Sequence, residues 1–182
     1  MQIKTIKVGP LRTNCYVVVD EKSGEAVVID PGDEAEKILP EIKGLKIRAI
    51  IVTHGHMDHF GAVSAIKQAT GARLLMHPAD NWFIVPDQNI GDKIFFGSIT
   101  FDVIPTPGHS PGGFCLYTKG FLFSGDTLFA NTYGRTDLPG SCEADMLRSL
   151  KRLAQLPDDT RVLPGHGDCT SIALEKERGT LE

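Results

Sequence analysis

The chain has 182 residues, a formal net charge of -4, 41% hydrophobic residues and 23% charged residues. These values are typical of a globular protein, and the length suits a single domain over residues 1–182 with a substantial core. The acidic balance and the lack of a Lys/Arg cluster argue against a nucleic-acid surface. No apolar stretch approaches the length of a membrane span, and residues 1–10 predict a strand rather than a signal peptide. We therefore expect neither nucleic acid nor a membrane as a partner.

The four cysteines are widely spaced and form no Cys-x-x-Cys pair: Cys15, Cys115, Cys142 and Cys169. This spacing favours free thiols in a reducing compartment over a disulfide framework. We expect a cytoplasmic protein in which these cysteines have structural roles.

Short runs rich in β-branched residues predict strands, and apolar residues three or four positions apart predict helices. We expect His59 at the start of one helix, and Ser141 as the N-cap of another with Glu143 in its first turn. The predicted strands are 2–8, 14–20, 25–30, 47–52, 73–76, 94–96, 99–104, 114–118, 121–124 and 160–163. The predicted helices are 33–43, 59–70, 79–85, 143–154 and 170–178. Strand clusters followed by helices occur twice, which indicates two layered halves.

Three of the six histidines and one carboxylate lie in residues 53–59, directly after the apolar strand predicted at 47–52. Functional groups in α/β folds gather at the ends of strands. His54, His56, Asp58 and His59 thus offer four coordinating side chains within six residues. Neutral imidazole with carboxylate suits zinc, iron or manganese, so this segment is a candidate metal site.

Three further candidate ligands also follow predicted strands, each in a loop that contains Gly or Pro: His109, Asp126 and His166. A single loop histidine is more often solvated or packed than metal-bound. Here, however, five of the six histidines lie at element ends, which indicates one site built from remote segments. The sixth, His77, has Pro78 beside it and no partner pattern, so we predict a structural role for it.

Other polar residues carry weaker predictions. Asp30 either holds a ligand histidine in place or only forms the turn before Pro31, and the sequence leaves both open. Arg135 and Asp137 predict an ion pair that braces their own loop.

The order of these seven residues, beginning with His54-x-His56-x-Asp58-His59, resembles the metallo-β-lactamase superfamily over nearly the whole chain. Residues 134–140 (Gly-Arg-Thr-Asp-Leu-Pro-Gly) and 163–167 (Leu-Pro-Gly-His-Gly) are similar to the short, glyoxalase II-like hydrolases. The resemblance implies an α/β fold, the αββα sandwich, in which two mixed sheets are flanked by helices. It also implies metals at one edge of the two sheets.

The resemblance further implies two divalent metal ions, with zinc expected first and iron or manganese as alternatives. His54, His56 and His109 would bind the first, Asp58, His59 and His166 the second, and Asp126 would bridge them. Seven ligands exceed the four of one tetrahedral zinc and suit two metals that share a carboxylate. The implied reaction is attack of a metal-held hydroxide, oriented by Asp58, on the carbonyl of a small acyl thioester such as S-lactoylglutathione.

Rival families share parts of this pattern. The persulfide dioxygenases have a similar ligand set, in which one iron uses the positions of His54, His109 and Asp126. Exported β-lactamases are disfavoured by the expected lack of an export signal, and some of them would carry cysteine in place of Asp126. Flavodiiron proteins usually have Glu in place of His56, and the nucleases need basic surfaces. A non-catalytic metal-binding protein of the same fold is disfavoured because all seven positions are intact.

The substrate is the least determined feature. Two-domain glyoxalase II enzymes bind glutathione partly through a C-terminal helical domain, which we do not expect after residues 170–178. The loop after Gly134 also lacks the Lys and Tyr that those enzymes use. Another small thioester is therefore an open alternative, and the sequence does not determine the oligomeric state.

Overall fold

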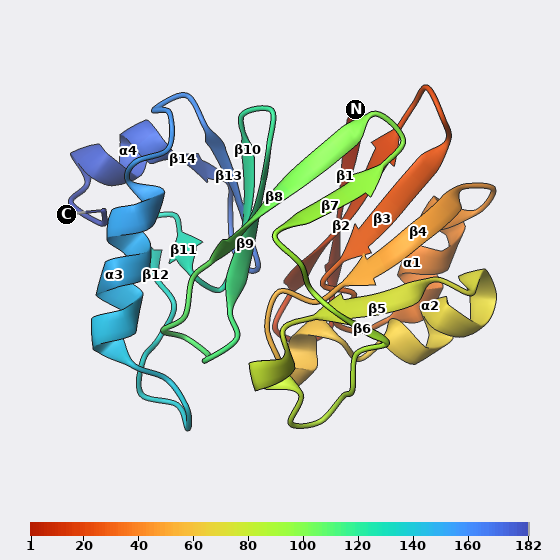
Figure 1. Ribbon diagram of the computed structural model, residues 1–182, viewed down its shortest axis with the longest axis horizontal. Helices are drawn as coiled ribbons and strands as arrows, with labels where there is room; N and C mark the ends of the chain where they lie inside the picture. The colour runs from red at the N-terminus through yellow and green to blue at the C-terminus, as the bar shows by residue number, and fades with distance from the viewer. Residues whose placement is uncertain (182) are drawn as a thin grey trace.

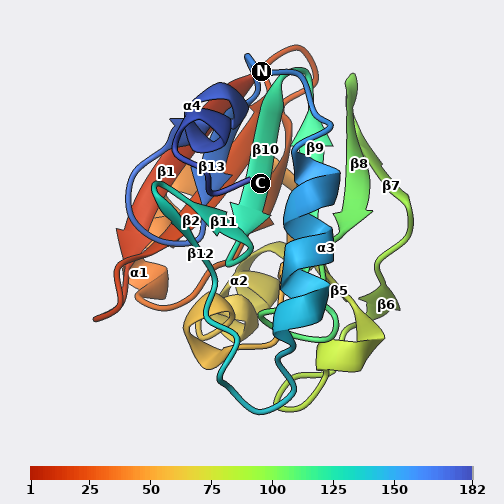
Figure 2. The ribbon, with the colours of Figure 1, turned by 90° about the vertical axis from the view of Figure 1, so that its left-hand side faces the viewer.

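Two six-stranded β-sheets face each other in the computed structural model of the chain, which describes residues 1–181 (Figure 1). Helices α1 (Ala35–Ile42) and α2 (Val63–Thr70) cover one sheet on its outer side. Helices α3 (Glu143–Leu153) and α4 (Ile172–Glu177) cover the other, and Figure 2 shows them in front of it. This arrangement is the αββα sandwich, so the predicted fold class is confirmed.

The first sheet has the strand order β1-β2-β3-β4-β5-β6. β1, β2 and β3 pair antiparallel, whereas β3, β4, β5 and β6 run parallel to one another. β2 and β3, predicted at 14–20 and 25–30, form a hairpin across Ser23-Gly24 that the pairing of Asp20 with Glu25 closes. The strands are β1 (Gln2–Val8), β2 (Thr13–Asp20), β3 (Glu25–Ile29), β4 (Lys46–Ile51), β5 (Arg73–Met76) and β6 (Gln88–Asn89).

The second sheet has the order β14-β13-β10-β9-β8-β7. β7, β8, β9 and β10 pair antiparallel in sequence, and β10 pairs parallel with β13. Its strands are β7 (Lys93–Phe96), β8 (Ile99–Pro105), β9 (Phe114–Thr118), β10 (Phe121–Gly125), β13 (Arg161–Pro164) and β14 (Thr170–Ser171). A separate small ribbon joins β11 (Leu128–Phe129) to β12 (Thr132–Tyr133).

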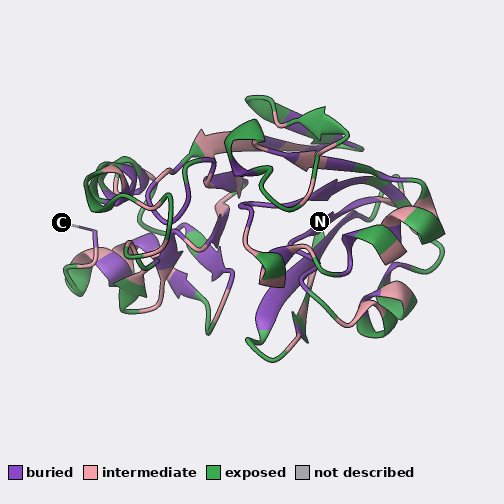
Figure 3. Ribbon diagram, turned by 90° about the horizontal axis from the view of Figure 1, so that it is seen from below, coloured by how far each residue is buried: buried purple, intermediate pink, exposed green. Residues whose placement is uncertain are grey.

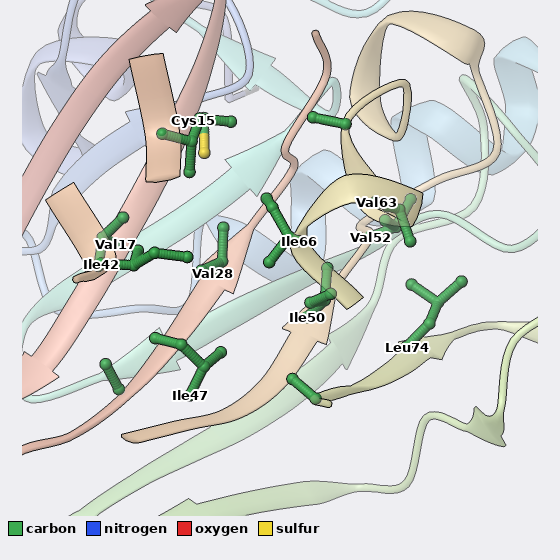
Figure 4. Close-up of a cluster of buried hydrophobic side chains, with 14 of the residues drawn as sticks. Cys15, Val17, Val28, Ile42, Ile47, Ile50, Val52, Val63, Ile66 and Leu74 are labelled. Carbon is green, nitrogen blue, oxygen red and sulfur yellow. The ribbon is translucent and has the colours of Figure 1, made fainter. Parts of the chain in front are cut away.

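Three apolar clusters hold these layers together. The period-two alternation of β2 puts Val17 in the cluster under α1 and α2 (Figure 4), and Val18 in the cluster between the two sheets. A third cluster packs Leu150 of α3 against Val162 of β13. Figure 3 accordingly shows strands that are mostly buried and helix turns that are exposed on their outer side. Burial on both faces explains the near-continuous apolar runs of the central strands.

The segment after β4 differs from its prediction. The 3₁₀ turn η1 (Met57–His59) stands apart from α2, which begins only at Val63, so His59 does not start that helix. Gly61 donates its backbone N–H to the carbonyl of Gly32 at 2.9 Å rather than to a carbonyl one helical turn back. Val63 donates its backbone N–H to the carbonyl of Phe60 at 2.9 Å, three residues back, whereas a helix that started at His59 would need a bond to the His59 carbonyl.

The helix predicted at 79–85 is also wrong. Only the 3₁₀ turn η2 (Pro78–Asp80) forms there, followed by irregular backbone. Pro86 disfavours the helical conformation of the residue before it, which limits a helix at this point.

Two helix starts are shifted. Cys142, not Ser141, is the N-cap residue of α3, and the Ser141 hydroxyl donates instead to the carbonyl of Leu138 at 2.6 Å. The helix predicted from residue 170 begins at Ile172, because the two preceding residues pair with β13 as β14. Sheet pairing with a remote strand therefore overrides the local helical pattern.

All four cysteines are free thiols, as predicted: Cys15 and Cys115 are buried, and Cys142 and Cys169 are exposed. Within residues 1–181, none of the helices combines the length and apolar character that crossing a bilayer requires.

Candidate metal centre

The seven predicted ligands converge at one edge of the two sheets. Because β8 and β10 each pair antiparallel with β9, β8 and β10 run in the same direction, and β13 is parallel to β10. Their carboxyl ends therefore lie at a common edge of the second sheet, and the end of β4 meets them from the first. His54 and His56 follow β4, Asp58 and His59 lie on η1, His109 follows β8, Asp126 follows β10, and His166 follows β13.

Asp126 lies at the centre of this cluster. Oδ1 of Asp126 is 3.5 Å from Nε2 of His59, and Oδ2 is 3.5 Å from Nε2 of both His109 and His166. Nε2 of His54 is 3.9 Å from Oδ2 of Asp126. A carboxylate surrounded by four imidazoles from three loops has the position that a bridging ligand between two metals requires.

The ligand atoms form three overlapping groups, each with atoms within 4.8 Å of one another. The groups are His54, His56 and His109; His54, His59 and Asp126; and Asp58, His59 and His166. The first and third are the two ligand sets that the resemblance implies, and the second links them. The structure thus brings all seven side chains together, while their role as metal ligands stays a prediction.

Three atoms of the cluster lack the hydrogen bonds that burial normally demands. They are His54 Nε2, His59 Nδ1 and Asp126 Oδ1, which are buried without a hydrogen-bond partner among the described residues. Buried polar atoms in native proteins are nearly always paired, and an ion is one of the accepted explanations when they are not. The donor set of imidazole nitrogens and carboxylate oxygens therefore fits divalent metals such as zinc or iron.

Three of the histidines form a hydrogen bond through Nδ1, and Nδ1 of a fourth, His59, lies close to a carboxylate oxygen. Nδ1 lies 3.2 Å from Thr53 Oγ1 in His54, 3.1 Å from Asp30 Oδ2 in His59, 2.9 Å from the Arg135 carbonyl in His109, and 3.1 Å from the Leu11 carbonyl in His166. A proton on Nδ1 that points to these oxygens leaves the Nε2 lone pair directed into the cluster. His56 is the exception and presents Nδ1, which lies 2.9 Å from His109 Nε2.

Asp30 has both roles that the sequence left open. It ends β3 in a left-handed conformation (φ 50), as a turn residue does. Its buried carboxylate also lies 3.1 Å from His59 Nδ1 and accepts hydrogen bonds from the backbone and hydroxyl of Thr53 at 2.7 and 2.8 Å. Asp30 therefore orients the imidazole of His59, one of the candidate ligands.

Asp80 is a residue of the site that the sequence prediction missed. Its carboxylate is fully buried and accepts the backbone N–H of Gly55 at 3.1 Å, the backbone N–H of Gly112 at 2.6 Å and the hydroxyl of Ser110 at 2.5 Å. These bonds tie the loop of His54 and His56 to the loop of His109. Its place just after β5, next to β4 in a parallel sheet, was the signal available in the sequence.

Gly165 leaves room that a side chain would take from the ligands. A Cβ on this residue would lie 2.3 Å from Asp126 Oδ1 and 2.8 Å from Cε1 of His59. The Pro164-Gly165-His166 sequence thus lets the backbone pass beside the central carboxylate.

The electrostatics of the cluster favour the neutral form of His54 and the ionised form of Asp58. Burial lowers the pKa of His54 well below its usual range, and the neighbouring His59 and His109 add to this effect. Burial works to raise the pKa of Asp58, but the hydrogen bond from His166 and the proximity of His59 outweigh it and hold the pKa below its usual range. Metals bind neutral imidazole and ionised carboxylate, so both groups are in the form that coordination needs.

His59 behaves differently from His54. Burial acts to lower the pKa of His59, but the carboxylates of Asp126 and Asp30 outweigh it, and the pKa is raised. Burial acts to raise the pKa of Asp126, but the adjacent His59 and His166 lower it. His59 and Asp126 thus each favour the charged form of the other.

The weaker predictions are confirmed as well. Arg135 forms two hydrogen bonds to Asp137, at 2.6 and 2.7 Å, in an exposed ion pair. His77 lies outside the three ligand groups and accepts the backbone N–H of Ala79 through Nδ1 at 3.2 Å.

Comparison with known proteins agrees with this geometry. Residues 8–166 match the Metallo-beta-lactamase superfamily. The chain is 32% identical to the "Hydroxyacylglutathione hydrolase GloC" of Haemophilus influenzae, over 97% of this chain and 95% of that protein. It is thus similar in sequence over nearly its whole length to a protein with a thioester hydrolase name.

Solved structures with other names are equally similar. BLEG-1, described as a B3 metallo-beta-lactamase, has a TM-score of 0.89 at 34% identity and covers 97% of both chains. TTHA1623 in a di-iron-bound form has a TM-score of 0.85 at 36% identity, over 96% of this chain and 98% of that one. ETHE1 from Myxococcus xanthus has a TM-score of 0.89 at 30% identity, over 98% of this chain and 83% of that one. The family match and the convergence of the seven side chains lead to one conclusion: the chain belongs to the metallo-β-lactamase superfamily.

Proposed function

We propose that this protein is a dinuclear metal-dependent hydrolase that cleaves small acyl thioesters, a reaction of the glyoxalase II type. The observation that carries the proposal is the linkage of the three ligand groups through His54, His59 and Asp126. Two linked sets around one central carboxylate suit a pair of metals better than a single ion. The similarity to the hydroxyacylglutathione hydrolase of H. influenzae supports the thioester substrate.

The proposed ligands are those of the two outer groups, with Asp126 between them. When bound, the two divalent cations would supply a hydroxide at neutral pH and positive charge that stabilises the developing oxyanion. The similarity to a protein solved in a di-iron form supports a two-metal site, and iron stands beside zinc and manganese as a candidate metal.

Asp58 is the proposed orienting residue for the attacking water. Its Oδ2 accepts the hydroxyl of Thr13 at 3.1 Å and lies 3.1 Å from His166 Nε2, so the carboxylate is held in one position. In the proposed reaction the water gives one proton to solvent, the resulting hydroxide oxygen forms a bond to the thioester carbon, and the C–S bond breaks. The thiolate leaves with the electron pair and takes up a proton afterwards, while the acid product ionises to a carboxylate. Because a thiol has a pKa of about 8.5, the thiolate can leave without a protein group that protonates it.

The experiment that tests this proposal combines metal analysis with a substrate panel. Metal content is measured by mass spectrometry on the purified protein, and the panel contains glutathione and coenzyme A thioesters together with one β-lactam. We expect about two metals per chain and hydrolysis of thioesters. Turnover of the β-lactam alone, or one metal per chain with no thioester turnover, would overturn the proposal.

The variant Asp126→Ala tests the role of the central carboxylate, and Asp102→Asn is its matched control. Loss of the central carboxylate should remove both metal and turnover, whereas Asp102→Asn, at a surface residue paired with Lys93, should leave both unchanged. Full metal content and activity in the Asp126 variant would contradict the two-metal assignment.

A mononuclear-iron persulfide dioxygenase is the second candidate function. Its reduced ligand set, His54, His109 and Asp126, lies within the same cluster. Similarity to both a hydroxyacylglutathione hydrolase and ETHE1 does not separate the two reactions. Oxygen uptake with glutathione persulfide, together with a single iron per chain, would favour this alternative over hydrolysis.

We further propose that the protein acts in the cytoplasm. Two of its four free thiols are exposed, and such thiols persist in reducing compartments.

A further inference from the structure

An apolar pocket of about 540 Å³ opens beside the candidate metal centre. It is lined by His56, Trp82, Phe83, Leu138, Pro139 and Gly140. His56 is the one candidate metal ligand among these residues, so the pocket is continuous with the site where the chemistry would occur. Its volume lies in the range of pockets that hold small organic ligands.

The wall of this pocket is formed by large apolar side chains that face solvent. Trp82 is 42% exposed and Phe83 is 69% exposed. The ring of Trp82 lies 6.2 Å from the ring of His56, and a Cβ on Gly140 would lie 3.3 Å from the indole. Exposed apolar residues that gather next to a reactive centre indicate a binding surface, whereas scattered ones do not.

Asp80 anchors the segment that carries Trp82 to the loop of candidate metal ligands. The buried carboxylate of Asp80 holds the backbone N–H of Gly55, between His54 and His56, and Trp82 follows Asp80 by two residues. The indole is therefore attached to the ligand loop through a short, hydrogen-bonded segment. An anchored backbone restricts the positions that the Trp82 side chain can take, which lowers the entropic cost of binding.

The absence of cationic side chains from the pocket lining disfavours an anionic occupant. The lining residues include no lysine and no arginine. The nearest cation in sequence, Arg135, is engaged by Asp137 through two hydrogen bonds. A carboxylate in this pocket would lose its hydration without gaining an ion pair.

From this geometry we infer that the pocket binds the acyl group of the substrate, and that this group is an aliphatic chain or an aromatic ring rather than a small hydroxyacyl group. The inference rests on the proposed thioester hydrolysis and specifies its substrate class. Since each methylene moved from water into an apolar site strengthens binding, kcat/KM should rise about two- to fourfold per added methylene until the pocket is filled.

The first test measures kcat/KM for N-acetylcysteamine thioesters with acetyl, butanoyl, hexanoyl and lactoyl groups. We expect hexanoyl to exceed acetyl and lactoyl by at least tenfold in the wild type, and this ratio to fall severalfold in Phe83→Ala. Val85→Ala is the matched control, because Val85 is exposed in the same loop but does not line the pocket. Equal kcat/KM for all four esters would overturn the inference.

A second series separates the two ends of the substrate. Here the acyl group is acetyl throughout, and the thiol carries alkyl chains of increasing length. A chain-length dependence confined to the thiol series would place the thiol in the pocket and overturn the acyl assignment.

The third test measures binding by fluorescence and needs no turnover. Because Trp82 is the only tryptophan of the chain, tryptophan emission reports on this pocket alone. Hexanoate should shift the Trp82 emission to shorter wavelength in a saturable manner, and lactate should not. Phe83→Ala should raise the dissociation constant for hexanoate about three- to tenfold, and Val85→Ala should leave it unchanged. No emission change with hexanoate would overturn the pocket, even if thioesters are hydrolysed. A clear shift without hydrolysis of any thioester would support the pocket and reject the proposed reaction.

Discussion

Nδ1 of His59 lies 3.1 Å from Oδ2 of Asp30, and both side chains are buried beneath the candidate metal centre. The same carboxylate accepts two hydrogen bonds from Thr53, the residue before the first candidate ligand. One buried acid thus connects the end of β3 to the ligand loop after β4. A metal site depends on such supporting contacts almost as strongly as on its ligands.

Replacing Asp30 with Asn should weaken metal binding without unfolding the protein. An amide has one acceptor oxygen, so it cannot serve both Thr53 and His59. We expect metal affinity to fall about 10- to 100-fold and the free energy of unfolding to fall by about 1–3 kcal/mol. Competition with a chelator and denaturant titration measure the two quantities. Unchanged affinity would mean that Asp30 only forms a turn.

Gly165→Ala should reduce metal binding by steric conflict alone. The new methyl group would lie 2.3 Å from Asp126 Oδ1, so the central carboxylate has to move. We expect metal affinity to fall about tenfold or more, which is the size of the effect when a residue that orients a metal ligand is changed. Gly91→Ala is the matched control, because a Cβ there meets nothing within 4 Å. Equal metal affinity in the two variants would contradict this account.

Asp80→Asn should loosen the contact between the two ligand loops. The substitution replaces an acceptor oxygen by a donor that faces the N–H and hydroxyl groups of the surrounding loops, at a cost of about 1–3 kcal/mol in stability. We also expect the Trp82 emission to move to longer wavelength, because the segment that follows Asp80 becomes more mobile. Denaturant unfolding and fluorescence spectra check both effects, with the exposed Asp92 changed to Asn as the control. A wild-type spectrum and wild-type stability would show that the three hydrogen bonds are dispensable.

Metal removal should lower the thermal stability of the protein. A ligand at 100 times its dissociation constant stabilises the native state by about 2.7 kcal/mol, which corresponds to about 5–10 °C in Tm for a chain of this size. We expect a chelator to lower the Tm of the wild type by this order and to have no effect on Asp126→Ala. Calorimetry provides the measurement. The same Tm with and without chelator would argue against a metal ligated by this cluster.

Asp20 should make the free energy of unfolding decrease as the pH falls into the acid range. Hydrogen bonds from the Ser98 backbone and the Ser23 hydroxyl lower the pKa of Asp20 to about 2. A carboxyl with a lowered pKa stabilises the native state above its unfolded pKa of about 4, and this contribution disappears as the pH falls toward 2. Asp20→Asn should therefore destabilise the protein at pH 6 but have little effect near pH 2.

Urea midpoints at pH 6, 4 and 2.5 test this dependence. The comparison is best made in the Asp126→Ala background, where acid release of metal does not contribute. The effect of adding Asp20→Asn to that background should shrink as the pH falls. An effect of the same size at all three pH values would contradict the assignment.

Local sequence patterns were sufficient for most of the architecture. Apolar runs bounded by turn residues predicted the long strands, because side-chain alternation and turn chemistry act over a few residues. The failures at 59–62, 79–85 and 170–171 share one cause. In each case a hydrogen bond or steric constraint from outside the helical pattern decides the backbone, as in the bond between Gly61 and Gly32.

The same distinction between local patterns and long-range contacts holds for the candidate site. The sequence by itself determined which imidazoles and carboxylates follow strands, and hence the order of the seven predicted ligands, because strand ends and Gly- or Pro-containing loops are local features. Only the tertiary structure decided that Asp30 and Asp80 support them, that Gly165 makes room beside Asp126, and that Trp82 and Leu138 line one pocket. Those contacts join segments far apart in the chain, and the pairing of distant loops leaves no period in the sequence from which it could be predicted.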